Sequence, residues 1–254
     1  MKTRPSKSAW WISGGLCICA IIGAKKMGFD LATFKGLASE SEPTLVKYMH
    51  PNWDNLPRLL GLLVQTVAMG IVGSVITMAL AIPATMVATK NLAPNRFVYG
   101  FTRQVLNFFR SMPDALIALI LVQGLGLGPL PGAIALGLHS SGYIAKTLAE
   151  KIERVDPRVY EGLRSCGASW FQTIRFGGWP SIEREIVADG LFILDRNIRV
   201  AATLGIVGAG GIGVELLSDL RTFHTNEAAT VILLIVILVL IVDTSSSYAR
   251  RRMG

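Results

Sequence analysis

Two long stretches without a charged residue constrain this chain more than any other feature. They run from Leu59 to Thr89 and from Ala115 to Ala145. Each is longer than the about 20 apolar residues that cross a bilayer core of about 30 Å as a helix. Backbone N–H and C=O groups find no water in hydrocarbon, so a stretch inside a membrane must satisfy them internally, as a helix does. We therefore predict an all-α integral membrane protein.

Composition supports this class. The chain has 254 residues, of which 51% are hydrophobic and 17% charged, which is too apolar for an ordinary soluble domain. A net charge of +8 would suggest nucleic acid if it formed a surface stripe. The basic residues instead gather at the ends of apolar segments, where they orient spans, so we expect no nucleic-acid partner. The three cysteines are an odd number without metal spacing and are interpreted as free thiols.

About six transmembrane helices are predicted. The first apolar segment could be a signal peptide, but Lys25 and Lys26 follow it directly and make a poor cleavage site. We therefore favour an uncleaved first span. The third span has to begin near Phe108 to be long enough, and Pro83 is expected to bend the second. The predicted segments lie at about 8–24, 59–89, 108–123, 133–145, 181–207 and 228–242, the last extended by polar flanks.

The distribution of lysine and arginine predicts the orientation. Basic residues are in excess at 1–7, 90–110, 146–175 and 250–252. Under the positive-inside rule these segments are cytoplasmic, and so are both termini. The chain then divides into three regions: an N-terminal span with an external elbow segment (1–57), a transmembrane domain (58–249) and a basic cytoplasmic tail (250–254).

A polar loop at 156–180, with the sequence DPRVYEGLRSCGASWFQTIRFGGWP, lies between two predicted spans. Asp156 is placed to cap a helix that begins with Pro157. Gly167 stands where a left-handed residue would end that helix. We predict two short helices joined at this glycine, with Pro180 opening the next long segment. Helical spacing predicts an apolar face formed by Val159, Leu163 and Cys166. The alternative is a loop that merely connects two spans at the membrane surface.

The fifth predicted span carries Asp195, Arg196 and Arg199. Charges at membrane depth cost a few kcal/mol each and normally face a bundle interior or a water-filled cavity. Arg196 and Arg199 are three residues apart and share a helix face. Two guanidinium groups there could bind a phosphorus oxyanion through bidentate hydrogen bonds. Alternatively, these residues pair with acids and fix packing, or they lie at the membrane interface.

The sequence GAGGIG at 208–213 matches the glycine pattern of dinucleotide sites, but it lacks the preceding strand and the βαβ unit. We expect a close-packed or flexible turn, or part of an external gate. The remaining sequence contains neither a nucleophile–base pair nor a phosphate-binding G-x-x-x-x-G-K motif. Its three histidines are dispersed. We therefore expect no catalytic residue, no metal site and no ATP bound by this chain.

The loop resembles the cytoplasmic loop of ATP-binding-cassette (ABC) importer permeases. Glu161, Gly167 and Pro180 occupy the Glu, Gly and Pro positions of that family's pattern. The departures are Gly162, Leu163, Gly177 and Trp179. Four further segments are similar to the phosphonate and phosphite branch of the family: 107–118, 139–142, 146–153 and 197–213. The resemblance covers roughly 55–249.

This resemblance implies a type I importer permease fold in the bacterial cytoplasmic (inner) membrane and a function in importing a phosphonate, phosphite or similar oxyanion. It implies a homodimer, two ATPase subunits that bind ATP and Mg on the cytoplasmic side, and an external solute-binding protein, so the chain itself is not an enzyme. Competing hypotheses are an importer for another solute such as an amino acid, and a stand-alone channel or membrane-embedded enzyme.

The residues expected to carry these roles fall into three groups. The coupling loop would use Asp156, Pro157, Glu161, Gly162, Gly167 and Pro180. The translocation path or gate would use Arg196, Asn197, Arg199, Gly208, Gly210, Gly211 and Gly213. The path could also use Arg110, Asp114, His139, Ser140 and Ser141, although the last three could equally satisfy local backbone or a neighbouring helix.

Overall fold

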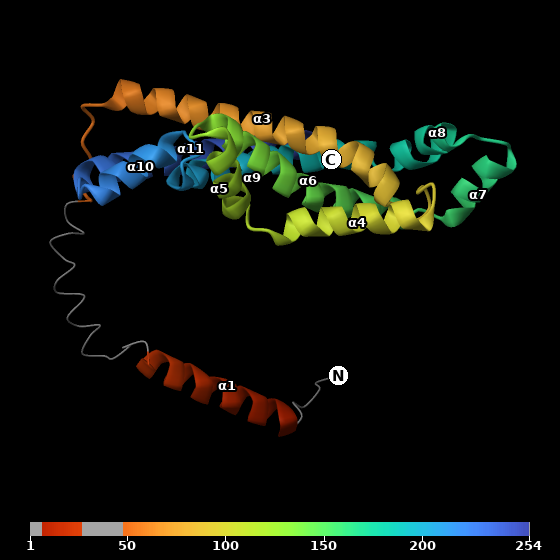
Figure 1. The fold of residues 1–254 in the computed structure, drawn as a ribbon, viewed down its shortest axis with the longest axis horizontal. Coiled ribbons are helices and arrows are strands. Elements are labelled where there is room, and N and C mark those ends of the chain that lie inside the picture. Colours follow the sequence, from red (N-terminus) through yellow and green to blue (C-terminus); the bar gives the residue numbers. More distant parts are fainter. Residues whose placement is uncertain (1–6, 27–47, 254) are drawn as a thin grey trace. The chain divides into compact units, whose positions relative to one another are not determined.

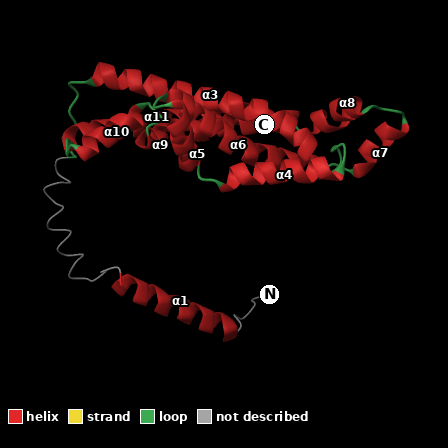
Figure 2. Cartoon of the chain, in the orientation of Figure 1, coloured by secondary structure: helices red, strands yellow, loops and turns green. Residues whose placement is uncertain are grey.

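The computed structural model describes residues 7–26 and 48–253. The chain divides into two units, residues 1–50 and 51–254, which are described separately. The described residues form helices and loops without a strand (Figure 2). The first unit contributes α1 (Lys7–Lys26), which covers the expected first span. The predictions for the basic residues at 1–6 and for most of the external segment, at 27–47, lie outside the described residues.

Helix α3 (Leu56–Ala88) runs along the second unit (Figure 1). It covers the uncharged stretch at 59–89 and contains Pro83. Its buried hydroxyl groups are satisfied within the helix: Ser74 Oγ donates to the carbonyl of Gly70 at 2.7 Å, and Thr77 Oγ1 donates to that of Gly73 at 2.8 Å. Such bonds to the preceding turn let a helix bury hydroxyl groups with their hydrogen-bonding needs met.

The predicted third span, beginning near Phe108, is not one continuous helix. The chain forms α4 (Arg96–Ser111) and α5 (Asp114–Leu125), which meet at 92°. Pro113 explains the break, because the residue before a proline is driven out of the helical region. Met112 accordingly has φ −78° and ψ 130°. The segment that begins near Phe108 is therefore the last turn of α4.

Helix α6 (Pro129–Glu153) packs against α3, α4, α5 and α9. Glycines allow close approach of its neighbours. A Cβ at Gly142 would lie 2.6 Å from the carbonyl oxygen of Leu106 in α4, and one at Gly137 would overlap the side chain of Ile76 in α3. Small residues at such crossings are typical of helix packing in membranes.

The C-terminal part contains α9 (Glu183–Leu204), a 3-10 turn η3 (Gly205–Val207), α10 (Ile212–Arg221) and α11 (Thr225–Met253). Residues 208–227 separate the fifth and sixth predicted spans, and we expected a loop there. This expectation is wrong, because α10 lies within the segment. Gly211, with φ 72°, turns the chain into α10, and Glu215 in the first turn favours a helix N-terminus. The predicted extension of the last apolar run by polar flanks is confirmed by α11.

Among the described residues, α3 and α11 are long and apolar enough to cross a membrane, and up to four spans result if each bent pair counts as one. These pairs are α4 with α5 and α9 with α10. The predicted number of about six spans stays a prediction. The division of the chain at 57 and 249 likewise stays a prediction, although the second compact unit begins nearby, at Pro51.

The loop at 156–180 and the turn at 208–213 lie toward different ends of the second unit. Figure 1 shows α7 and α8, the helices of the loop, at one end and α10 near the other. At the α10 end the backbone N–H of Asn52 donates to the carbonyl of Asn226 at 3.2 Å, which joins the segment before α3 to the first turn of α11.

Candidate functional site

The loop contains α7 (Pro157–Ser165) and α8 (Trp170–Thr173), followed by a π turn η1 (Ile174–Gly178) and a 3-10 turn η2 (Trp179–Ser181). The predicted caps are confirmed. The Asp156 carboxylate accepts from the N–H of Arg158 at 3.0 Å, and Pro157 is the first residue of α7. Gly167 has φ 78°, and its N–H donates to the carbonyl of Arg164 at 2.9 Å. Residues of the loop itself therefore fix where α7 begins and ends.

The predicted apolar face of α7 is only partly correct. Val159 and Cys166 are exposed, while Leu163 is half-buried. Tyr160 is the buried residue of α7, with 2% of its surface exposed. A Cβ at Gly177 would lie 3.1 Å from the Tyr160 ring, so α7 packs on the second half of its own loop. Burial raises the pKa of the Tyr160 phenol above its ordinary value of 10.0.

Two side chains fix the loop to the connection between α3 and α4. Arg164 Nη2 donates to the carbonyl of Asn91 at 2.7 Å. Trp170 Nε1 donates to that of Leu92 at 2.6 Å. A displacement of α7 and α8 would therefore pull on the end of α3 and the start of α4.

The outer surface of the loop is open. Glu161 is exposed, and a Cβ at Gly162 would meet no atom within 4 Å. Beyond α8, exposed aromatic residues and Arg175 line an open cavity of about 490 Å³, formed by Phe171, Ile174, Arg175, Phe176 and Trp179. Large exposed apolar patches mark contacts with other proteins or with a membrane.

A buried polar junction joins α9 to α6 and α3. Asn197 has 0% of its surface exposed. Ser140 Oγ donates to Asn197 Oδ1 at 2.9 Å, and Asn197 Nδ2 donates to Ser74 Oγ at 3.1 Å. Buried polar groups that are hydrogen-bonded in this way specify a unique packing. The predicted pathway role of Asn197 stays a prediction, and its contacts are those of a packing residue.

A cationic cavity lies beside this junction. It has a volume of about 380 Å³ and is lined by Arg110, His139, Tyr143, Phe192 and Arg196. Arg196 Nη1 donates to Ser140 Oγ at 2.9 Å, and its Nη2 lies 3.6 Å from Asp114 Oδ2. The Arg110 guanidinium stands 5.7 Å from the centre of the Tyr143 ring. Two guanidinium groups from different helices thus face one open space.

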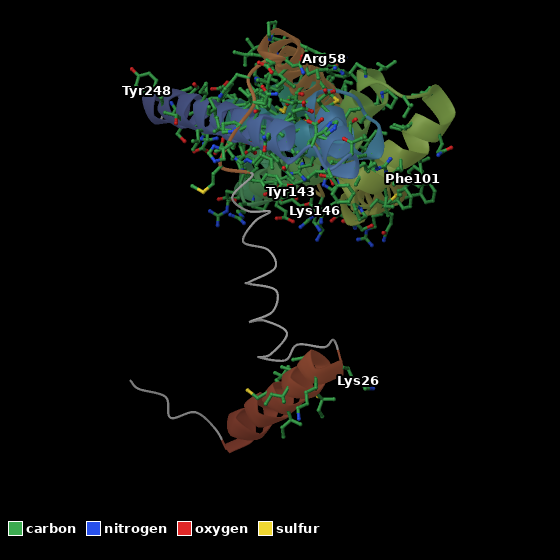
Figure 3. The ribbon with its side chains drawn as sticks, turned by 90° about the vertical axis from the view of Figure 1, so that its left-hand side faces the viewer. Lys26, Arg58, Phe101, Tyr143, Lys146 and Tyr248 are labelled. Atoms are coloured by element: carbon green, nitrogen blue, oxygen red, sulfur yellow. The ribbon has the colours of Figure 1, made fainter. Side chains whose placement is uncertain are left out.

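Two polar residues of α6 close to this cavity serve the backbone, as the alternative reading expected. His139 Nδ1 lies 2.9 Å from the carbonyl oxygen of Met112, at the break between α4 and α5. Ser141 Oγ donates to the carbonyl of Leu138 at 2.8 Å. Figure 3 shows that Tyr143 and Lys146 lie on the side of the bundle opposite Arg58.

Arg199 does not join Arg196 at the cavity. It pairs with Asp195 at 3.0 Å, and 51% of its side chain is exposed. Arg196 therefore shares the cavity with Arg110 and not with Arg199, and the predicted oxyanion-binding role of these arginines stays a prediction. The sequence reading missed Tyr143 and Phe192. Helical spacing could have found them, because each is four residues from a predicted pathway residue on the same helix.

The glycine turn is close-packed. Gly208, Gly210 and Gly211 have φ angles of 87°, 81° and 72°, a region that residues with a Cβ rarely adopt. The N–H of Gly211 donates to Gln65 Oε1 at 3.1 Å. A Cβ at Gly213 would overlap the carbonyl oxygen of Ala202. The close-packed alternative is confirmed, while the gate role stays a prediction.

Comparison with protein families decides the class. Residues 81–254 match the family described as "binding-protein-dependent transport system inner membrane component". The chain belongs to this family. Its long apolar helices suit an integral inner-membrane protein.

Curated relatives of this family member carry names from phosphorus uptake. The chain is 34% identical over 218 residues to the phosphate-import permease protein PhnE of Mycolicibacterium smegmatis, covering 85% of this chain and 40% of the relative. It is 36% identical over 183 residues to the phosphite transport system permease protein PtxC of Stutzerimonas stutzeri, covering 72% and 66%. The chain thus spans less than two thirds of the length of either relative.

Solved structures identify the fold. The permease-family chain matches a chain of the inward-facing methionine ABC transporter MetNI with a TM-score of 0.64 at 20% identity, covering 77% of this chain and 96% of that one. It matches a chain of an amino acid ABC transporter with a TM-score of 0.61 at 15% identity, covering 79% and 98%. The predicted type I ABC importer permease fold is confirmed.

The sequence analysis also missed a cluster of three polar side chains near the start of α11. Asp219, His224 and Glu227 each offer a potential ligand atom, and these atoms all lie within 4.8 Å of one another. The expectation of no metal site considered the spacing of histidines and cysteines alone. One histidine between two carboxylates, with four and two intervening residues, is a signal that could have been noted.

Proposed function

We propose that this family member is the transmembrane subunit of an ABC importer that moves a phosphorus oxyanion, such as a phosphonate or phosphite, across the bacterial cytoplasmic membrane. The observation that carries the proposal is the cavity at which Arg110 and Arg196 converge from different helices. The names of the relatives, which refer to phosphate and phosphite, support the same class of solute.

The chemistry of the cavity suits an oxyanion that binds and leaves. Guanidinium groups present planar sets of donors that match phosphate-like oxygens. Arg196 is held by Ser140 but lies at 3.6 Å from Asp114, at the outer limit of a close ion pair. An arriving oxyanion can therefore compete with Asp114 for Arg196, and Asp114 can reclaim it on release. Arg110 contacts the Tyr143 ring and keeps donors free for the solute.

The proposed mechanism is alternating access driven by ATP. Two copies of this chain enclose the path, two ATPase subunits bind ATP and Mg, and an external solute-binding protein delivers the solute. The loop at 156–180 faces the cytoplasm, as do both termini, and the α10 end faces outward. ATPase closure displaces α7, and the bonds from Arg164 and Trp170 transmit the displacement to α3 and α4. Rigid-body motion of this kind is common in transporters.

Uptake by the reconstituted transporter tests the solute site. We expect Arg196→Gln and Arg110→Gln to reduce the uptake of phosphite and methylphosphonate at least about tenfold, since each removes a charged hydrogen-bond donor worth about 1.5–3 kcal/mol. Arg199→Gln is the matched control, because it removes the same charge from the same helix away from the cavity, and uptake per folded transporter should stay within about threefold.

Two results would contradict this site. One is normal uptake by folded Arg196→Gln and Arg110→Gln variants. The other is an equal loss in Arg199→Gln, which would indicate a general effect of positive charge on α9. Uptake of an amino acid in place of the oxyanions would retain the fold and mechanism and change the solute.

A further inference from the structure

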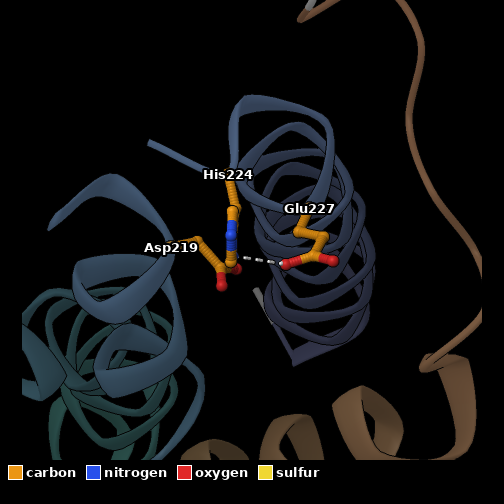
Figure 4. A group of neighbouring side chains, drawn as sticks. All are labelled: Asp219, His224 and Glu227. Carbon is orange, nitrogen blue, oxygen red and sulfur yellow. Dashed lines mark ion pairs between the residues drawn. The ribbon is translucent and has the colours of Figure 1, made fainter. Parts of the chain in front are cut away.

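Three metal-ligating side chains converge at the end of the bundle that contains α10. Asp219 lies on α10, Glu227 lies in the first turn of α11, and His224 lies in the turn between them. Figure 4 shows the three side chains directed toward one another. His224 Nδ1 is 3.2 Å from Glu227 Oε2, and one ligand atom from each residue falls within 4.8 Å of the others.

Asp219 is a largely buried residue whose carboxylate borders a small cavity. Only 7% of its surface is exposed. Among the hydrogen bonds and ion pairs of the described residues, none reaches the Asp219 carboxylate. The carboxylate lines a small cavity of about 20 Å³ together with Glu215 and Glu227, which is enough space for one water-sized species. The His224 ring is not part of this lining and lies against Glu227.

The charges around this cavity favour a cation. Burial raises the pKa of Asp219 most, and the carboxylates of Glu215 and Glu227 raise it further, while His224 and Arg58 lower it. Arg58 is already paired with Glu215 at 2.9 Å. Its guanidinium is engaged there, and the His224 ring is the close neighbour of the Asp219 and Glu227 carboxylates.

We propose that Asp219, His224 and Glu227 bind a divalent transition-metal ion, of which zinc fits the donors best. Zinc is bound by His nitrogen and by Asp or Glu oxygen, and it accepts three protein ligands and a fourth from water. Ligand atoms about 2.0–2.2 Å from a tetrahedral zinc ion lie about 3.4 Å apart. The ligand atoms here lie within 4.8 Å of one another, so binding would draw them closer together by up to about 1.4 Å.

A metal at this position would fasten one end of the bundle. Asp219 belongs to α10 and Glu227 to α11, and Thr230 Oγ1 of α11 donates to the carbonyl of Asn52 at 2.7 Å, before α3 begins. The ion would hold α10 against α11 beside the segment that leads into α3. This inference stands apart from the proposed solute and from the ATPase.

Zinc binding to the full chain in detergent micelles, freed of metal by chelation, tests the proposal. We expect calorimetry with zinc chloride to detect one zinc per chain and to detect no binding of calcium or magnesium at the same concentrations. Asp219→Asn and His224→Gln should each weaken zinc binding more than about tenfold, because each removes one of three ligands. Asp54→Asn and His50→Gln are matched controls with exposed side chains and should bind zinc like the original chain.

Thermal melting separates lost ligation from misfolding. Without zinc, Asp219→Asn should melt at the same temperature as the original chain or higher, because it removes a negative charge that is repelled by Glu215 and Glu227. With zinc, the melting temperature of the original chain should rise and that of the variant should stay unchanged. Absence of saturable zinc binding by the original chain would overturn the proposal. Unchanged binding by both ligand variants, or an equal zinc-dependent rise in Asp219→Asn, would overturn it as well.

Discussion

The loop at 156–180 and the junction around Asn197 are both polar, but they satisfy their polar groups in opposite ways. In the loop, the Asp156 carboxylate and the Ser169 hydroxyl bond to backbone N–H groups two or three residues away. At the junction, the side chain of Asn197 bonds to residues 57 and 123 positions away in the sequence. The loop is organised locally, whereas the junction exists only when three helices have packed.

This difference determines which substitutions should disturb each region. A locally capped loop keeps its shape when its outer surface changes, so it can carry a recognition surface. The junction shared by α3, α6 and α9 is buried and hydrogen-bonded across all three helices, so a change there acts on the packing of the bundle. The cationic cavity lies against this junction through Ser140, which bonds both Asn197 and Arg196.

Asn197→Leu should have the largest effect. It removes the acceptor of Ser140 and the donor to Ser74, and each buried group left unpaired costs about 1–3 kcal/mol. Melting of the detergent-solubilised protein should show a clear fall in the transition temperature. Asn107→Leu, at an exposed position of α4, is the matched control and should change the stability by less than about 0.5 kcal/mol. Equal melting of the two variants would remove the distinction drawn here.

Gly213→Ala should follow in size. A Cβ at Gly213 meets the carbonyl oxygen of Ala202 and the backbone of Gly205, and overpacking of this kind costs about 1–3 kcal/mol. Gly162→Ala in α7 is the control, because its Cβ meets open space. That change should leave stability unaltered or increase it by up to about 1 kcal/mol through helix propensity. Similar melting temperatures for the two variants would contradict this prediction, because they would show that the backbone around Gly213 can shift to accept a Cβ atom.

Asp156→Ala should have a smaller and local effect. Loss of an N-cap costs about 1 kcal/mol, and the loop is anchored elsewhere by Arg164 and Trp170. Hydrogen exchange should therefore accelerate in residues 158–165 while the helices α3 and α9 keep their protection. Faster exchange throughout the bundle would contradict the local character of the loop.

Ionisation of the Tyr160 phenol should have the smallest effect on stability near neutral pH. Burial raises its pKa above 10.0, so the folded state holds the proton more tightly than the unfolded state. Its contribution to stability is then fully present below pH 10 and is lost as pH rises above it. An alkaline absorbance titration compared with Tyr160→Phe should show one phenol that ionises late. Ionisation of Tyr160 together with exposed phenols would contradict its burial.

The same contrast explains what could be predicted from sequence. The caps at Asp156 and Gly167 follow from residues that are adjacent in the chain, and both predictions are correct. The helix break at Pro113 was missed because length alone suggested a continuous span, although the proline carried the signal. The replacement of Arg199 by Arg110 at the cavity depends on how α4 packs against α6 at Gly142, a tertiary fact that spacing along one helix does not contain.

We propose that the loop at 156–180 couples this chain to an ATPase subunit. Isolating a complex of this chain with the ABC ATPase encoded beside it tests this proposal most directly. The original chain, Glu161→Arg and the control Asp54→Arg would each be expressed with the ATPase and purified. Glu161 is exposed on α7, and Asp54 is exposed near the start of α3. The account predicts a complex with ATPase activity for the original chain and for Asp54→Arg, and loss of the complex for folded Glu161→Arg. A complex that survives in Glu161→Arg, or is absent for every well-folded form, would contradict it.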